Sequence, residues 1–124
     1  MKGYQFYMQD FKANVLGSEW SVVFGTEKEY QNLSEMDGYA DFSTHQIVID
    51  TMEKADGQIG FKGDMTEYKK QVIRHEIIHA FLYESGLEAC STTSDNWALN
   101  EEMVDWFAIQ SPKIFKLFYE WKLI

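Results

Sequence analysis

The sequence contains little of what several protein classes require. Its 124 residues include one cysteine, Cys90, so no disulfide can form within the chain, and we expect a reducing compartment such as the cytoplasm. No apolar run approaches the roughly 18 residues of a transmembrane helix. No cationic segment followed by an apolar one opens the chain, as a signal peptide would. We therefore expect a soluble protein without a membrane partner.

Basic residues are also scarce. Eleven Lys and Arg stand against twenty Asp and Glu, which gives a net charge of −9, and the basic residues are scattered. A phosphate-binding surface needs clustered Lys and Arg, so we expect no nucleic-acid partner. The acidic excess instead favours metal retention and, weakly, cationic partners.

The length supports one domain over residues 1–124, and an aromatic content of 16% allows a sizeable core. The only proline, Pro112, follows Ser111 and predicts the start of a last helix with proline in its first turn. Five large apolar residues of that helix are expected to pack in the core. They are Ile114, Phe115, Leu117, Phe118 and Trp121.

Two pairs of strands are predicted before the middle of the chain. Phe11–Leu16 and Glu19–Phe24 flank Gly17-Ser18, a two-residue hairpin signal, and Gly38–Phe42 and Gln46–Asp50 form the second pair. A short helix is expected between the pairs over Glu27–Leu33, and loops are expected over 53–63 and 87–98. The predicted fold is α+β, with a small antiparallel or mixed sheet packed on a central helix and two further helices after it.

The central helix is predicted from about Asp64 to Ser85. Asp64 or Thr66 can cap its start, and no proline or glycine interrupts it before Gly86, a favourable residue just after a helix end. Apolar residues occupy most of its circumference, which is typical of a buried helix.

This helix contains the stretch HEIIH, which begins at His75. His75 and His79 are four residues apart, so both rings lie on one face and can reach a single ion, for which tetrahedral Zn²⁺ is the natural occupant. Glu76 projects from the adjacent edge, where it can deprotonate a metal-bound water. The alternative is a pair of core histidines hydrogen-bonded to backbone or carboxylate groups.

A third ligand is expected from a second helix over Leu99–Phe107. Glu101 can complete a His₂Glu site, and Asp105, one turn later, can accept the spare ring N–H of a zinc-binding histidine. Glu102 is the competing third ligand, because the two glutamates are adjacent. A solvated acidic helix start would also explain these glutamates individually.

HEIIH followed by NEEMVD resembles the gluzincin clan of zinc metallopeptidases, whose thermolysin-like members carry H-E-x-x-H and then N-E-x-x-x-D. The resemblance covers roughly residues 64–110 and implies a minimal zincin. It implies zinc ligands His75, His79 and Glu101, with Glu76 as general base and Asp105 bonded to His75. The whole chain is also similar to small phage- and prophage-encoded metallopeptidase-like proteins, which implies the cytoplasm of a bacterial host.

The expected activity is hydrolysis of a peptide bond in a peptide or protein substrate, with narrow specificity. In enzymes of this clan an edge strand above the zinc helix pairs with the substrate, and Gln46–Asp50 is the predicted strand, through Gln46, Ile47, Val48 and Ile49. His45 and Tyr83 are candidates for stabilising the oxyanion, although a surface histidine and a packing tyrosine are the simpler interpretations. The alternative function is a zinc-stabilised interaction module with little turnover. A fourth protein ligand, Glu102 or Cys90, would favour that alternative.

Overall fold

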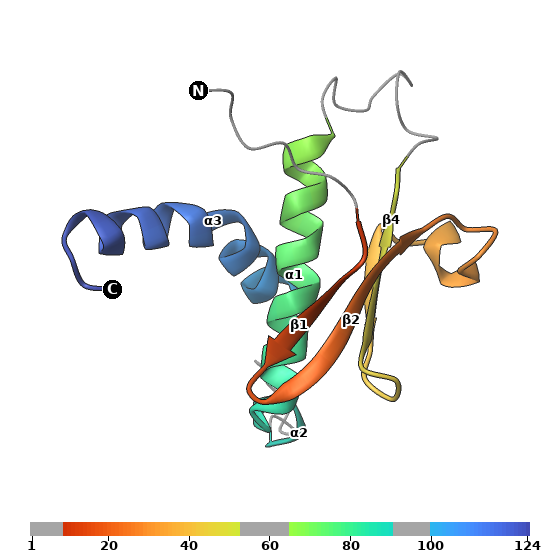
Figure 1. Ribbon diagram of the computed structural model, residues 1–124, viewed down its shortest axis with the longest axis horizontal. Coiled ribbons are helices and arrows are strands. Elements are labelled where there is room, and N and C mark those ends of the chain that lie inside the picture. Colours follow the sequence, from red (N-terminus) through yellow and green to blue (C-terminus); the bar gives the residue numbers. More distant parts are fainter. Residues whose placement is uncertain (1–8, 53–64, 91–99) are drawn as a thin grey trace.

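The computed structural model describes residues 9–52, 65–90 and 100–124 and has a small α+β fold, as the sequence predicts (Figure 1). A four-stranded sheet lies on one side of the long helix α1, and α3 lies on the other side. The elements in chain order are β1 (Phe11–Val15), β2 (Ser18–Gly25), the 3₁₀ helix η1 (Gln31–Ser34), β3 (Gly38–Asp41), β4 (Gln46–Asp50), α1 (Thr66–Glu84), α2 (Leu87–Cys90) and α3 (Glu101–Glu120).

The sheet is mixed, and its strand order is β1-β2-β4-β3. β1 and β2 form an antiparallel hairpin, β2 and β4 are parallel, and β3 is antiparallel to β4. β4 therefore lies inside the sheet and is hydrogen-bonded on both sides. The two edge strands are β1 and β3.

The first hairpin turns one residue earlier than predicted. Val15 pairs with Ser18, so the turn residues are Leu16 and Gly17, with φ angles of 51° and 92°. Two positive φ angles match the right-handed twist of the flanking strands. The side chain of Asn14 accepts a hydrogen bond of 2.8 Å from the Gly17 N–H, which helps to hold this turn.

The second strand pair forms almost as predicted, with β3 ending at Asp41 and β4 matching Gln46–Asp50. The helix predicted over Glu27–Leu33 is wrong in type and position, since the structure has only the short 3₁₀ helix η1. The residues before η1 form a turn, in which the carbonyl of Thr26 accepts hydrogen bonds from the N–H groups of Glu29 and Tyr30.

The hydrophobic core lies between the sheet and α1. Trp20, Val22, Ile47 and Ile49 are fully buried, and α1 contributes a group of buried residues along the face that it turns to the sheet. The group consists of Val72, Ile73, Glu76, His79 and Ala80. Two titratable side chains are therefore enclosed in an otherwise apolar layer.

The ends of α1 differ from each other. Met65 occupies the N-cap position and forms no side-chain cap, so Thr66 begins the helix instead of capping it, and Asp64 lies outside the described residues. After the helix, Gly86 has a φ angle of 83°, as predicted for a glycine that ends a helix.

α3 is one continuous helix, which corrects the prediction of a new helix at Ser111-Pro112. Asn100 caps it, with its side chain accepting a hydrogen bond of 2.8 Å from the Met103 N–H. Pro112 lies inside the helix and has no N–H to give to the carbonyl of Ala108. Nε of Arg74, on α1, donates to that carbonyl at 2.6 Å, so the two helices are joined at the position that the proline leaves unbonded.

The second half of α3 extends away from the rest of the molecule (Figure 1). The prediction that its large apolar side chains pack in the core is therefore wrong. Ile114 is half-buried, while Phe115, Leu117, Phe118 and Trp121 are exposed, Trp121 by 73%. Sequence patterns show that a helix has an apolar face, but they do not show whether another element lies against it.

Two predicted loops fall largely outside the described residues. The loop over 53–63 lies there entirely, and the loop over 87–98 begins with the short helix α2 before leaving the described part. Within the described part of the chain, no helix has the length and apolar character needed to cross a membrane.

Candidate metal centre

His75 and His79 lie one turn apart on α1 and point toward the same space, as their spacing predicts. Their Nε2 atoms are 3.1 Å apart, and both side chains are largely buried, with exposures of 14% and 11%. Burial, partly offset by the Glu101 carboxylate, lowers the pKa of His79. That shift favours the neutral ring, which is the form that binds a metal.

Glu101, at the first position of α3, completes the cluster. One carboxylate oxygen lies 2.9 Å from Nε2 of His75 and the other lies 2.9 Å from Nε2 of His79. Glu102 is not part of this cluster, which among the described residues joins ligand atoms of the two histidines and Glu101 within 4.8 Å of one another.

The donor set fits a zinc ion. Two ligands of a tetrahedral site, each about 2.0–2.1 Å from zinc, are about 3.3 Å apart, close to the separations of 2.9–3.1 Å found here. Two imidazoles and a carboxylate are also the set that zinc uses in His₂Glu sites. The separations leave room for one small cation at the centre of the three groups.

Asp105 fixes the orientation of His75. Its Oδ1 atom accepts a hydrogen bond of 2.7 Å from Nδ1 of the ring, which leaves Nε2 as the nitrogen that faces His79 and Glu101. A cation held between the three groups would use the lone pair of Nε2 while Nδ1 keeps its proton.

Glu76 lies beside the cluster on the face of α1 that meets the sheet. It is 7% exposed, and its Oε2 is 4.0 Å from Nε2 of His75. Burial raises the pKa of Glu76 to about 7, with the carboxylates of Glu101 and Asp105 adding to the rise and His75 opposing it. A carboxyl with a pKa near neutrality can both accept and release a proton there.

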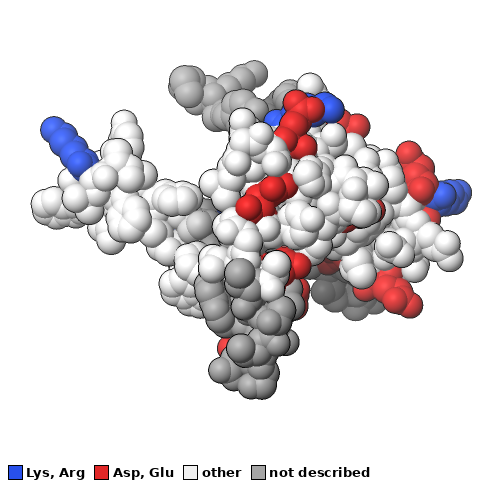
Figure 2. All heavy atoms as spheres, turned by 90° about the horizontal axis from the view of Figure 1, so that it is seen from below, with Lys and Arg blue, Asp and Glu red and all other residues white. Residues whose placement is uncertain are grey.

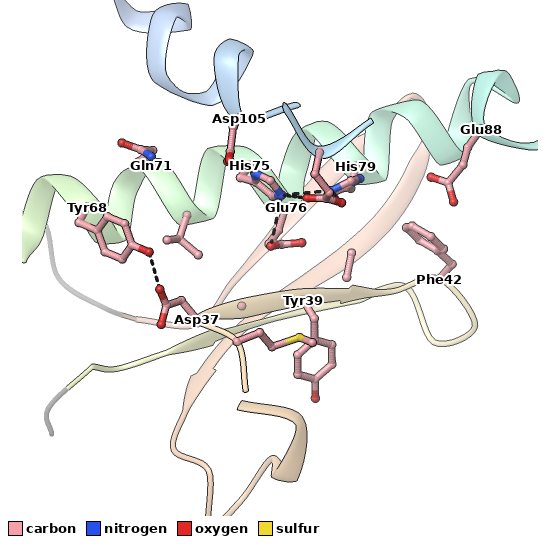
Figure 3. Close-up of a pocket in the computed structure, with 15 residues that line it drawn as sticks. Asp37, Tyr39, Phe42, Tyr68, Gln71, His75, Glu76, His79, Glu88 and Asp105 are labelled. Atoms are coloured by element: carbon pink, nitrogen blue, oxygen red, sulfur yellow. Dashed lines mark hydrogen bonds and ion pairs between the residues drawn. The ribbon is translucent and has the colours of Figure 1, made fainter. Parts of the chain in front are cut away.

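An open pocket of about 680 Å³ runs between α1 and the edge strand β3, with the cluster at its middle (Figure 3). Figure 3 shows Tyr68 and Asp37 at one end of it and Glu88 and Phe42 at the other. The lining is Met36, Asp37, Gly38, Tyr39, Ala40, Phe42, Tyr68, Gln71, Val72, His75, Glu76, His79, Glu88, Glu101 and Asp105.

One end of the pocket is closed by a pair of hydrogen-bonded side chains. The hydroxyl of Tyr68 donates to a carboxylate oxygen of Asp37, which connects α1 to the residue before β3. Burial and this carboxylate raise the pKa of Tyr68 to about 12, so the phenol stays protonated at neutral pH. The pair satisfies both polar groups at this end.

The pocket is strongly acidic. Its described lining residues include no Lys or Arg and five carboxylates, Asp37, Glu76, Glu88, Glu101 and Asp105. The same imbalance appears on the face shown in Figure 2, where red acidic side chains lie across the body of the molecule and the few blue basic ones lie toward its edges.

The strand predicted to pair with a substrate is the wrong one. Gln46–Asp50 forms β4, which is paired on both sides and therefore has no free edge. Ile47, Val48 and Ile49 are fully buried, and none of the four residues predicted there, Gln46 included, lines the pocket. The free edge beside the cluster belongs to β3, whose first three residues line the pocket.

The two candidates for oxyanion stabilisation also lie away from the cluster. His45 stacks on Trp20 with ring centroids 4.9 Å apart, and Tyr83 stacks on Phe42 with centroids 4.6 Å apart. Nε2 of His45 is 3.5 Å from the carboxylate of Glu84. Neither candidate is among the described residues that line the pocket, and both rings take part in aromatic stacking.

Sequence reasoning missed two parts of the pocket, Glu88 and the edge of β3. Glu88 lies on α2, which is a separate helix after α1. Helical spacing therefore does not relate Glu88 to His79. β3 lies at the edge beside the pocket because β4 pairs with β2. The residues of the individual strands do not indicate this strand order.

Comparison of the chain with protein-family models, with curated proteins and with solved structures finds no match. The resemblance to gluzincins therefore rests on the two sequence motifs.

Proposed function

We propose that the protein is a zinc-dependent peptidase of narrow specificity. The observation that carries this proposal is the convergence of His75, His79 and Glu101 at the middle of an open pocket. A structural zinc site is usually closed by four protein ligands, whereas a catalytic site keeps one position open. Among the described residues only these three groups converge, and the buried Glu76 stands beside them.

The chemistry follows from the groups around the cluster. Zinc bound there would lower the pKa of a coordinated water to about 7 and polarise a peptide carbonyl. Glu76 accepts the proton of the attacking water and later delivers it to the leaving amine. Asp105 keeps the Nδ1 proton on His75, so that Nε2 remains free to bind the metal.

The edge of β3 supplies the place for an extended substrate. β3 is an edge strand, hydrogen-bonded to β4 on one side only, and its first residues line the pocket opposite α1. A peptide that adds to this edge would pass beside Glu76 and the cluster. This assignment replaces β4 as the proposed substrate strand.

The first experiment measures metal content by mass spectrometry after zinc loading. We expect one zinc per chain in the wild type and in Glu102→Ala, and loss of zinc in Glu101→Ala. Equal zinc content in both variants, or none in the wild type, would refute the proposed ligand set.

The second experiment measures hydrolysis of a mixture of random peptides. The zinc-loaded wild type should cleave some of them, and zinc-loaded Glu76→Gln should cleave none. Zinc binding without cleavage of peptides or proteins would support the alternative, a zinc-stabilised interaction module.

A further inference from the structure

Among the described carboxylates of the pocket, Glu88 is explained neither by the metal centre nor by the pair of Tyr68 and Asp37. Glu101 belongs to the proposed ligand set, Asp105 bonds His75, Glu76 stands beside the histidines, and Asp37 accepts from Tyr68. Glu88 does not belong to the ligand cluster. Its carboxylate points from α2 into the pocket, on the His79 side of the centre (Figure 3).

One oxygen of Glu88 is buried without a partner. Oε2 has almost no exposed surface and makes no hydrogen bond within the part of the chain that the structure describes. Burial, followed by the charge of Glu101, raises the pKa of Glu88. A buried carboxylate oxygen without a partner is costly, and a cation held near the same carboxylate from the pocket would offset part of that cost.

The surroundings of Glu88 match the shape and charge of a basic side chain. Figure 3 shows Phe42 at the same end of the pocket, where its ring can carry the aliphatic stem of a lysine or arginine. An aromatic ring also attracts the cation at the end of that stem. Among the described residues that line the pocket there is no Lys or Arg to pair with Glu88.

We infer that Glu88 and Phe42 form a specificity subsite for a lysine or arginine side chain of the substrate, next to the bond that is cut. This inference rests on the proposed zinc site, because the centre defines where the substrate lies. It adds the class of substrate, a peptide with a basic residue close to the cleavage point. The acidic lining would also concentrate such peptides by long-range attraction.

The test uses two ligands whose binding does not depend on turnover. Aminocaproyl hydroxamate and heptanoyl hydroxamate both chelate zinc and have chains of matched length, but only the first ends in an ammonium group. Calorimetry on zinc-loaded protein should show the ammonium ligand binding about ten- to a hundredfold more tightly, the usual range for a hydrogen bond to a charged group. In Glu88→Gln most of the preference for the ammonium ligand should be lost, while Glu102→Gln, which changes an exposed carboxylate outside the pocket, should keep the preference.

The outcomes separate this inference from the proposed function. Tight binding of both hydroxamates without preference for the ammonium would refute the subsite and leave the zinc centre standing. Failure of both to bind would refute the centre and the subsite together.

A mixture of N-acetylated random peptides then tests the source of the cation. We expect cleaved products to be enriched in Lys or Arg at one position beside the cut, and enriched in Asp or Glu there with Glu88→Lys. Cleavage of the same peptides only when their amino termini are left free, without any side-chain preference, would overturn the assignment to a basic side chain.

Discussion

Glu76 should make the stability of the zinc-free protein depend on pH. Its pKa is about 7 in the folded protein, against an ordinary value of 4.5. The folded state therefore binds the proton more tightly than the unfolded chain, and stability is lost as the pH rises from 4.5 to about 7. This difference between the two pKa values lowers the free energy of unfolding by about 3 kcal/mol, since one pKa unit corresponds to about 1.4 kcal/mol.

The substitution Glu76→Gln removes the ionisable group and keeps the shape of the side chain. With zinc removed by a chelator, the free energy of unfolding of the variant should rise by about 3 kcal/mol relative to that of the wild type between about pH 4 and about pH 8. Urea denaturation followed by tryptophan fluorescence measures this difference, because Trp20 is buried in the core. Glu67→Gln, at an exposed position of the same helix, is the matched control.

Zinc provides a second check of the same reasoning. A cation beside Glu76 favours its ionised form, so the pH-dependent difference between wild type and variant should shrink when zinc is added. A stability difference that is equal at both pH values without zinc would show that Glu76 is not buried as an acid.

Three further substitutions test how the pocket and the helices are held. Asp105→Ala should weaken zinc binding by about 10- to 100-fold in competition with a chromophoric chelator, because it removes the acceptor of the His75 ring N–H. Arg74→Met should cost about 1–3 kcal/mol in urea denaturation, because the buried carbonyl of Ala108 loses its donor, and adding Pro112→Ala should recover part of that loss. Gly38→Ala should lower thermal stability by about 1–3 kcal/mol, because a new Cβ would lie 3.0 Å from a methyl group of α1. Unchanged zinc affinity of the Asp105 variant would contradict the first expectation. A stability loss in Arg74→Met that Pro112→Ala does not reduce would contradict the second, and wild-type thermal stability of Gly38→Ala would contradict the third.

The parts of the site that depend on helical spacing could be predicted from the sequence. His75 and His79 share a face because they are four residues apart, and the same spacing places Glu101 and Asp105 on one side of α3. Asp105 then discriminates between the two adjacent glutamates, since only Glu101 lies one turn before it. Spacing groups the residues within each helix, but it does not by itself place α3 against α1.

The parts that depend on which elements meet could not be predicted in the same way. β4 has the apolar, β-branched residues of a strand, yet those residues suit an internal strand as well as an edge. Pro112 is compatible with a helix start and also with a helix interior where another group satisfies the freed carbonyl. Only the contact with Arg74 decides between the two positions.

That contact also determines how α3 can lie along α1. Every other carbonyl in the middle of a regular helix already has a donor from its own chain, so only Ala108 can receive the Arg74 side chain without competition. If α3 slid by a turn, Arg74 would meet an occupied carbonyl and Ala108 would be buried without a donor. The single proline of the chain therefore fixes the position of α3 along the axis of α1. That position places the carboxylates of Glu101 and Asp105 opposite the two histidines.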